Sequence, residues 1–224
     1  VSREAQDEFA HLSQQKYQAA HEAGKFKNEI VPVGIPQKRA DPIYFDKDEH
    51  PRLSTLEKLS SLQPAFKEGG TVTAGNSSGI NDGAAACLIV NEKTLKQFGL
   101  TPMARVKSMA IAGVSPDVMG IGPIPATQKA LKRAGLKAND LDLIELNEAF
   151  AAQAIPCMKE LDLDPEKVNV NGGSIAIGHP LGASGTRISA TLLHEMQKRE
   201  GAKYGLATMC VGVGQGAAII FEKC

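Results

Sequence analysis

Apolar residues recur every three or four positions in the opening segment of the chain. Ser2 is a good N-cap, and Phe9 and Leu12 follow it at helical spacing until Gly24 ends the pattern. The spacing predicts an amphipathic helix over residues 3–23.

The next fifty residues show no continuous hydrophobic pattern. A short apolar run at Glu29–Val33 predicts a strand, and a Pro-rich, charged stretch over Gln37–Arg52 predicts a long irregular loop. A capping box that begins at Ser54 predicts a short helix over Thr55–Leu62. Residues 1–75 are therefore interpreted as an irregular, partly helical domain.

Residues 76–224 alternate buried-strand patterns with helical patterns, which predicts an α/β layer structure with a mostly parallel sheet. Four apolar runs predict buried strands at Ala84–Val90, Ala104–Ala112, Leu141–Leu146 and Val168–Val170. Helical spacing predicts helices at Glu92–Phe98, Pro125–Ala134, Glu148–Leu161 and Gly182–Glu200. Two last runs meet across a glycine turn and predict a terminal hairpin of Tyr204–Cys210 and Gly216–Glu222.

Composition indicates a folded globular protein and limits the classes of partner that we expect it to bind. The 224 residues are 42% hydrophobic, and 25 Lys and Arg residues balance 25 Asp and Glu residues. A chain without net charge has no long-range field that attracts nucleic acid or an anionic membrane. No apolar run approaches the roughly 20 residues that span a bilayer. We therefore expect neither a nucleic-acid partner nor a membrane partner.

The four cysteines are widely spaced, without a CxxC pair, which predicts reduced thiols and neither a disulfide framework nor a metal site. Reduced thiols favour a cytoplasmic protein. The chain begins at Val1 directly before a predicted helix and without an initiator Met, which suggests a truncated polypeptide. An organelle stays open as a location, since a targeting segment would lie in the absent part.

Three loops with reactive side chains follow predicted strands. They are Asn147–Phe150, Asn171–Gly185 and Cys210–Gly216. Open α/β sheets bind their ligands at the carboxyl ends of strands, so we expect these loops to form one site.

His179 lies among several glycines and leads directly into a predicted helix. Near neutral pH an imidazole there can act as a base or donate to a developing oxyanion. The alternative interpretation is a polar residue in a strand–helix turn. A phosphate-binding loop is a weak alternative, because the glycine spacing fits neither GxxxxGK[ST] nor GxGxxG after a strand.

Cysteine and asparagine in the other loops also have simpler interpretations. Cys210 can be a buried small apolar residue instead of a reactive thiol. Asn147 can cap the helix predicted to begin at Glu148. Cys87 and Cys157 are interpreted as core residues, because each lies within a predicted apolar element.

Taken together, these loops resemble the thiolase family. Its patterns NEAFA, GGxxAxGHPxGxSG and CxGxGxG occur here in that order, and a fourth segment is similar to the one that receives the pantetheine of coenzyme A. The matching stretches are Asn147–Ala151, Gly172–Gly185, Cys210–Gly216 and Thr71–Ala84. The resemblance implies a thiolase-like layered α/β/α half, preceded by part of the CoA-contacting loop domain.

The resemblance implies a reversible Claisen condensation of two acetyl-CoA to acetoacetyl-CoA plus CoA, or thiolysis of a 3-ketoacyl-CoA. The substrates are CoA thioesters, and no covalently bound cofactor is implied. His179 would deprotonate a nucleophilic cysteine, and Asn147 would hold a water in the first oxyanion hole. Cys210 would move the α-carbon proton through a thiol of lowered pKa, while the Gly212 N–H would contribute to a second oxyanion hole.

The same resemblance implies contacts with CoA. Ser78 and Ala74 would line the pantetheine tunnel, Ala149 and Phe150 would crowd the acyl end, and Arg52 would reach the nucleotide.

This chain departs from the family pattern in one respect: none of its cysteines matches the Cys-Ser-like loop that carries the nucleophile of the family. The resemblance therefore implies a missing N-terminal thiolase half, a homodimer or homotetramer in the complete enzyme, and no turnover from this chain alone. Two alternatives stay open: a ketoacyl synthase of similar fold, and a non-catalytic CoA-binding or assembly subunit complemented in trans. An NAD-binding dehydrogenase is disfavoured, because the dinucleotide fingerprint is absent. Preference for acetoacetyl or longer acyl chains also stays open.

Overall fold

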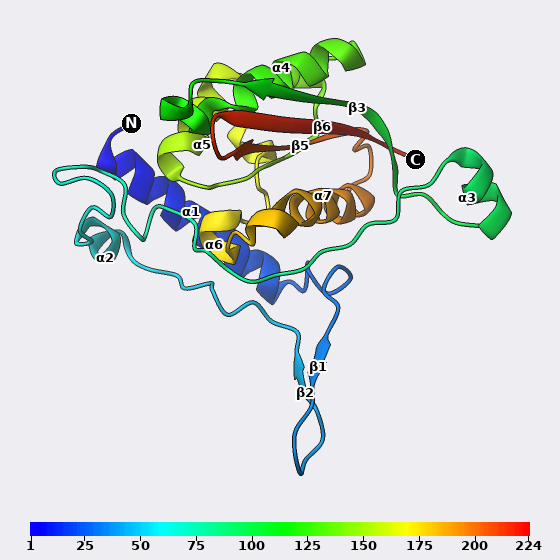
Figure 1. The fold of residues 1–224 in the computed structure, drawn as a ribbon, viewed down its shortest axis with the longest axis horizontal. Helices are drawn as coiled ribbons and strands as arrows, with labels where there is room; N and C mark the ends of the chain where they lie inside the picture. Colours follow the sequence, from blue (N-terminus) through cyan, green and yellow to red (C-terminus); the bar gives the residue numbers. More distant parts are fainter.

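A computed structural model describes all 224 residues as a layered α/β body with two projecting segments (Figure 1). The helices are α1 (Arg3–Glu22), α2 (Leu56–Ser60), α3 (Glu92–Phe98), α4 (Pro123–Ala134), α5 (Ala151–Glu160), α6 (Ser174–Ile177) and α7 (Leu181–Lys198). The strands are β1 (Val33–Ile35), β2 (Ile43–Phe45), β3 (Ala104–Gly113), β4 (Leu143–Leu146), β5 (Tyr204–Val211) and β6 (Gln215–Lys223). None of these helices combines the length and apolar character needed to cross a membrane.

The main sheet is mixed, with the strand order β3-β6-β5-β4. Only β4 and β5 run parallel, because the α5 to α7 segment forms the long crossover that a parallel pair requires. The short turn between β5 and β6 forces an antiparallel pair, and β3 is antiparallel to β6. The predicted layered α/β fold and terminal hairpin are confirmed, but the mostly parallel sheet is wrong.

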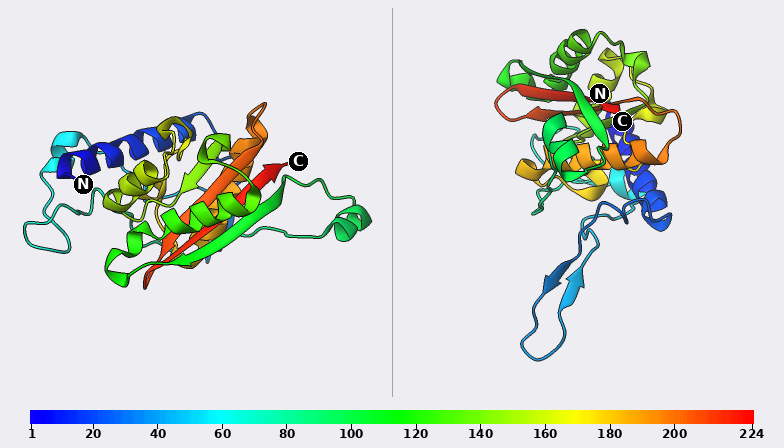
Figure 2. Two further views of the ribbon diagram at one scale, coloured as in Figure 1. Left: turned by 90° about the horizontal axis from the view of Figure 1, so that it is seen from above. Right: turned by 90° about the vertical axis from the view of Figure 1, so that its right-hand side faces the viewer.

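The opening helix is confirmed, and the Ser2 side chain accepts a hydrogen bond from the backbone N–H of Ala5 at 3.2 Å. Strands β1 and β2 pair antiparallel as a hairpin. β1 overlaps the strand predicted at Glu29–Val33 only at Val33, and β2 lies within the stretch predicted to be irregular. This hairpin is exposed throughout and extends away from the body (Figures 1 and 2). The short helix α2 is capped by Thr55, one residue after the predicted Ser54.

Two predicted strands are wrong. Residues 84–90 form no strand, and 84–89 are exposed, because their apolar side chains meet no partner strand. Val168 makes a single bridge to Ile144 in place of a strand. The helix α3 that follows the exposed stretch has its predicted bounds and projects from the body (Figure 2).

The two faces of the main sheet are covered unequally. Helices α4 and α5 lie on one face (Figure 1), over a core of fifteen buried residues that includes Leu206 and Ile220. Helix α7 lies on the other face, chiefly over β4 and β5, where the core holds six buried residues. We call these the closed face and the open face.

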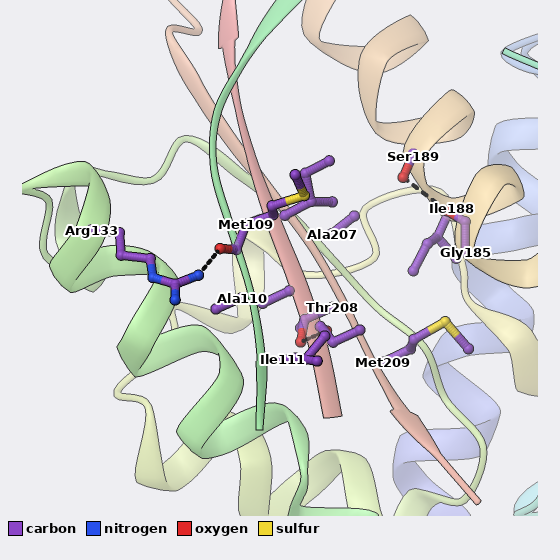
Figure 3. Close-up of a pocket in the computed structure, with 13 residues that line it drawn as sticks. Met109, Ala110, Ile111, Arg133, Gly185, Ile188, Ser189, Ala207, Thr208 and Met209 are labelled. Carbon is purple, nitrogen blue, oxygen red and sulfur yellow. Dashed lines mark hydrogen bonds between the residues drawn. The ribbon is translucent and has the colours of Figure 1, made fainter. Parts of the chain in front are cut away.

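The open face contains an apolar groove of about 400 Å³ between α7 and β3. Figure 3 shows Ile188 and Gly185 of α7 on one side and Met109 and Ile111 of β3 on the other. Met109 and Ile111 are 65% and 73% exposed. At the edge, Arg133 of α4 donates to the backbone oxygen of Met109 at 2.6 Å.

Candidate active site

Asn147 and Cys210 lie at the carboxyl ends of the two parallel strands. Asn147 follows β4 directly, and its backbone N–H donates to the oxygen of Thr208 on β5 at 2.9 Å. Cys210 is the second residue after Thr208 on β5, so it lies at the same sheet edge. The parallel pairing therefore carries two of the predicted site residues to one edge, as expected.

A buried carboxylate holds the glycine-rich loop beside this edge. Glu148 accepts hydrogen bonds from Ser13 Oγ at 2.7 Å, Asn169 Nδ2 at 2.8 Å and the backbone N–H of Ile175 at 3.1 Å. A Cβ at Gly173 would lie 2.2 Å from the Glu148 carboxyl carbon. Glycine at position 173 is thus required by close packing against Glu148.

His179 is held at both ring nitrogens. Its Nδ1 lies 2.6 Å from Ser184 Oγ, and its Nε2 makes a long contact of 3.5 Å with Asn147 Nδ2. Its backbone N–H donates to Asn81 Oδ1 at 3.1 Å. The structure therefore brings together the residues of two predicted loops.

The polar contacts determine the tautomer of His179 in this arrangement. Asn147 Nδ2 only donates, so the facing Nε2 is the acceptor and the ring proton is on Nδ1, where Ser184 Oγ accepts it. Burial lowers the pKa of His179 below its usual value, and the positive charge of Arg187 lowers the pKa further. A neutral ring with an unprotonated Nε2 is suited to removing a proton.

Asn147 is not a helix cap. Helix α5 begins at Ala151 with Phe150 as its N-cap, so the alternative interpretation of Asn147 is wrong. Its side chain instead forms a hydrogen bond within the site, where Oδ1 accepts from Ser174 Oγ at 2.5 Å.

Cys210 is buried on the closed face, and burial raises the pKa of its thiol to about 11. The expectation of a lowered pKa is therefore wrong for this chain, since no positive group faces the sulfur to offset the desolvation. Cys157 is a core residue as predicted, but Cys87 is exposed together with its stretch of chain.

Gly212 lies exposed in the β5–β6 turn, and a Cβ there would meet open space. The close backbone approach occurs nearby, where a Cβ at Gly216 would lie 1.9 Å from the oxygen of Gly122. Glycine is thus sterically required at position 216, while position 212 leaves room beside its backbone.

Three of the residues expected to contact CoA lie together. The backbone N–H and the Oγ of Ser78 both donate to the oxygen of Ala149, at 3.1 Å and 3.2 Å. The neighbouring Phe150 packs edge-on against Phe66. Ala74 and the side chain of Arg52 are exposed, and the Arg52 backbone N–H donates to Gln14 Oε1 at 3.2 Å.

Residue patterns alone did not single out three side chains of the hydrogen-bond network around His179 and Asn147, or the buried Glu145, which feels the charge of Arg187. Ser174 and Arg187 join Asn147 through hydrogen bonds, Ser184 holds His179, and Glu145 is buried on β4. Burial raises the pKa of Glu145 to about 8, although Arg187 opposes the rise. The serines stand within the glycine-rich motif, but sequence spacing carries no signal for their partners.

No group of three or more His, Cys, Asp or Glu side chains is arranged to hold a metal ion.

Family models for thiolases match most of the chain. The model "Thiolase, N-terminal domain" matches residues 1–93, and "Thiolase, C-terminal domain" matches residues 100–223. Among curated relatives, the acetyl-CoA acetyltransferase of Thiocystis violacea is 58% identical over 99% of this chain and 56% of its own length. That of Cupriavidus necator is 57% identical over 100% of this chain and 57% of its own length. The chain thus spans just over half the length of these relatives.

Solved structures give the same result for the fold. The acetyl-CoA acetyltransferase of Bacillus anthracis superposes with a TM-score of 0.96 and 48% identity, over 100% of this chain and 57% of that protein. Human mitochondrial 3-ketoacyl-CoA thiolase in complex with CoA superposes with a TM-score of 0.91 and 45% identity, over 100% of this chain and 55% of that protein. The sequence motifs, the fold and the site all lead to one conclusion: this chain belongs to the thiolase family.

Proposed function

We propose that this chain forms the acid/base and oxyanion part of a thiolase active site that acts on CoA thioesters. The reaction is the reversible condensation of two acetyl-CoA to acetoacetyl-CoA plus CoA, or the thiolysis of a 3-ketoacyl-CoA. The observation that carries the proposal is the contact of His179 with both Ser184 and Asn147. Relatives named acetyl-CoA acetyltransferase support the choice of acyl group.

In the first half-reaction, His179 Nε2 takes the proton from a nucleophilic cysteine contributed by protein outside these 224 residues. The thiolate attacks the thioester carbonyl, the C–S bond to CoA breaks, and His179 returns the proton to the departing CoA sulfur. An amide N–H of Asn147, acting through a water, and the imidazole stabilise the developing oxyanion.

In the second half-reaction, Cys210 exchanges a proton with the acetyl α-carbon, and the backbone N–H of Gly212 supports the enolate oxygen. A thiol whose pKa is raised to about 11 is protonated near neutral pH. This is the form that donates a proton to the α-carbon when a 3-ketoacyl thioester is cleaved, so the resting state of Cys210 suits thiolysis.

The proposed CoA path follows the chain from the surface to the acid/base residues. Arg52 would contact the nucleotide, Ala74 and Ser78 the pantetheine, and Ala149 and Phe150 the acyl group. The contact of Ser78 with Ala149 supports the inner part of this path. A homodimer or homotetramer is proposed for the complete enzyme.

A chimera tests the proposed function. Residues 1–224 would replace the matching part of the Cupriavidus necator acetyl-CoA acetyltransferase, and thiolysis of acetoacetyl-CoA would be measured. We expect an active chimera, with kcat/KM reduced about 10²- to 10⁴-fold by His179→Ala, because a general base is lost. His194→Ala is the matched control, since His194 lies on α7 and its ring makes no hydrogen bond to the site.

A non-catalytic CoA-binding subunit is the second candidate, because none of the four cysteines of this chain lies in the Cys-Ser-like loop that carries the nucleophile of the family. A folded chimera that binds CoA without turnover would support that candidate. Full activity in the His179→Ala chimera would contradict the role of His179.

A further inference from the structure

A chain of hydrogen bonds reaches His179 from helix α7 through Arg187 and Ser174, which lie outside the proposed chemistry, and then through Asn147. Arg187 Nη2 donates to Ser174 Oγ at 2.7 Å, Ser174 Oγ donates to Asn147 Oδ1 at 2.5 Å, and Asn147 Nδ2 faces His179 Nε2 at 3.5 Å. We propose that Arg187 and Ser174 are positioning residues that orient the Asn147 amide and thereby select the tautomer of His179. This inference rests on the proposed function for its consequence in catalysis.

The direction of the chain follows from the donors and acceptors available. Arg187 has only donors, so Ser174 Oγ must accept from it. The single hydroxyl hydrogen of Ser174 is then free for Asn147, and an amide accepts a hydrogen bond only through its oxygen. The amide oxygen of Asn147 therefore faces Ser174, and its NH₂ group faces His179.

Arg187 makes no other hydrogen bond within the protein. Its Nε and Nη1 are buried without a partner, and none of the five ion pairs includes Arg187. Its one hydrogen bond goes to Ser174.

The charged groups around Arg187 come from several elements. Glu145 on β4, Glu148 after β4 and Glu29 between α1 and β1 all feel its charge, which opposes the rise in the pKa of each carboxyl. His179 feels the same charge, which lowers its pKa. Arg187 therefore acts on His179 in two ways, through the amide and through its charge.

Loss of the hydrogen bond from Arg187 to Ser174 changes the orientation of the Asn147 amide. Arg187 holds the Ser174 hydroxyl with its hydrogen directed at the Asn147 amide. Without Arg187 the hydroxyl can rotate and accept from Asn147 Nδ2, and the amide can turn to present its oxygen to His179. An oxygen facing Nε2 favours the Nε2–H tautomer, which lacks the lone pair required of the base. The same contact favours the protonated ring and raises the pKa of His179.

Nitrogen NMR of the ¹⁵N-labelled chain tests the inference without any assay of activity. The His179 signals, assigned by their loss in His179→Gln, report the tautomer directly. We expect mainly Nδ1–H in the unmodified chain and a larger Nε2–H fraction in both Arg187→Ala and Ser174→Ala. Ser174→Ala keeps the Arg187 charge, so a shift there isolates the orientation of the amide.

Controls distinguish orientation from loss of charge or fold. Arg199→Ala removes one positive charge from the end of α7 beyond the site, where Arg199 pairs with Glu195, and should leave the tautomer unchanged. Arg187→Lys, which keeps a donor, should restore part of the Nδ1–H fraction. An unchanged tautomer in a well-folded Ser174→Ala variant would overturn the inference.

The chimera separates this inference from the proposed function. Ser174→Ala should lower kcat about 10- to 100-fold with little change in KM, because the base is misoriented while CoA binding is kept. An inactive parent chimera would count against the proposed function, while the NMR result would stand by itself. A tautomer shift without an effect on kcat would overturn the catalytic consequence.

Discussion

The two faces of the main sheet share strands and alternating side chains but differ in how they are covered. On β3, Ala110 points to the closed face and is 4% exposed, whereas its neighbour Ile111 points to the open face and is 73% exposed. On β6, Ile220 is fully buried and Ile219 is only partly buried. The apolar pattern is therefore equally strong on both faces, although α7 covers the open face only in part.

Strand alternation therefore indicates which face of the sheet a side chain lies on, but it does not indicate whether a helix covers that face. The groove is lined by apolar side chains of both β3 and α7 that no helix covers. The groove lies on the side of the sheet that α7 covers only in part.

A charged substitution at adjacent positions gives the largest predicted contrast. Ala110→Asp places an unpaired carboxylate in the closed core and should lower the free energy of unfolding by about 4 kcal/mol. Ile111→Asp places the same group in solvent and should change it by about 0.5 kcal/mol or less. Urea unfolding of both variants followed by circular dichroism measures the difference.

Dye binding provides the control for the same pair. Ile111→Asp should reduce the fluorescence of a hydrophobic dye bound to the folded chain, because it interrupts the groove. Equal destabilisation by the two substitutions would mean that the open face is covered in solution, and the contrast between the faces would be lost.

Elements that depend on local sequence could be predicted from the chain alone. Helices α3 and α7 lie within two residues of their predicted ends, because periodic apolar positions and caps are local properties. Residues 84–90 failed for the opposite reason. An apolar run becomes a strand only when another strand supplies hydrogen bonds, and none does so here.

The main residues of the candidate site could also be predicted from the sequence, but the contacts that hold them could not. His179 and Asn147 stood out because reactive side chains followed strands, and the structure brings them into contact. The links from Asn147 to Ser174 and Arg187 depend on how α6 and α7 pack beside β4, which no local spacing encodes. The raised pKa of Cys210 likewise follows from burial on the closed face.

Alkaline pH should weaken the closed face selectively. Burial raises the pKa of Cys157 to about 12, against an ordinary value of 9.0, so the folded chain holds this proton more tightly than the unfolded chain does. The stabilisation is complete below about pH 9 and is lost as the pH rises toward the folded value, by about 1.4 kcal/mol per pH unit. Urea unfolding between pH 8 and pH 11 measures this slope.

Two variants distinguish the effect of the buried Cys157 thiol from that of other groups that lose a proton at alkaline pH. Cys157→Ala should reduce the slope, while Cys87→Ala should leave it unchanged because Cys87 is exposed. The same slope in all three proteins would show that Cys157 keeps an ordinary pKa and that the closed face admits water.

A substitution in the turn between β5 and β6, which belongs to neither face, should have the smallest effect on the free energy of unfolding. Val213 adopts a φ of +68° between β5 and β6, a left-handed conformation that crowds a β-branched side chain, and it is 81% exposed. Val213→Gly should raise the free energy of unfolding by about 1 kcal/mol, since relief of strain exceeds the extra chain entropy that glycine brings. Val211→Gly is the control: it replaces a valine on the strand itself, where φ is not positive, and should destabilise the chain. Destabilisation by Val213→Gly would mean that the valine side chain makes contacts worth more than the strain of its backbone.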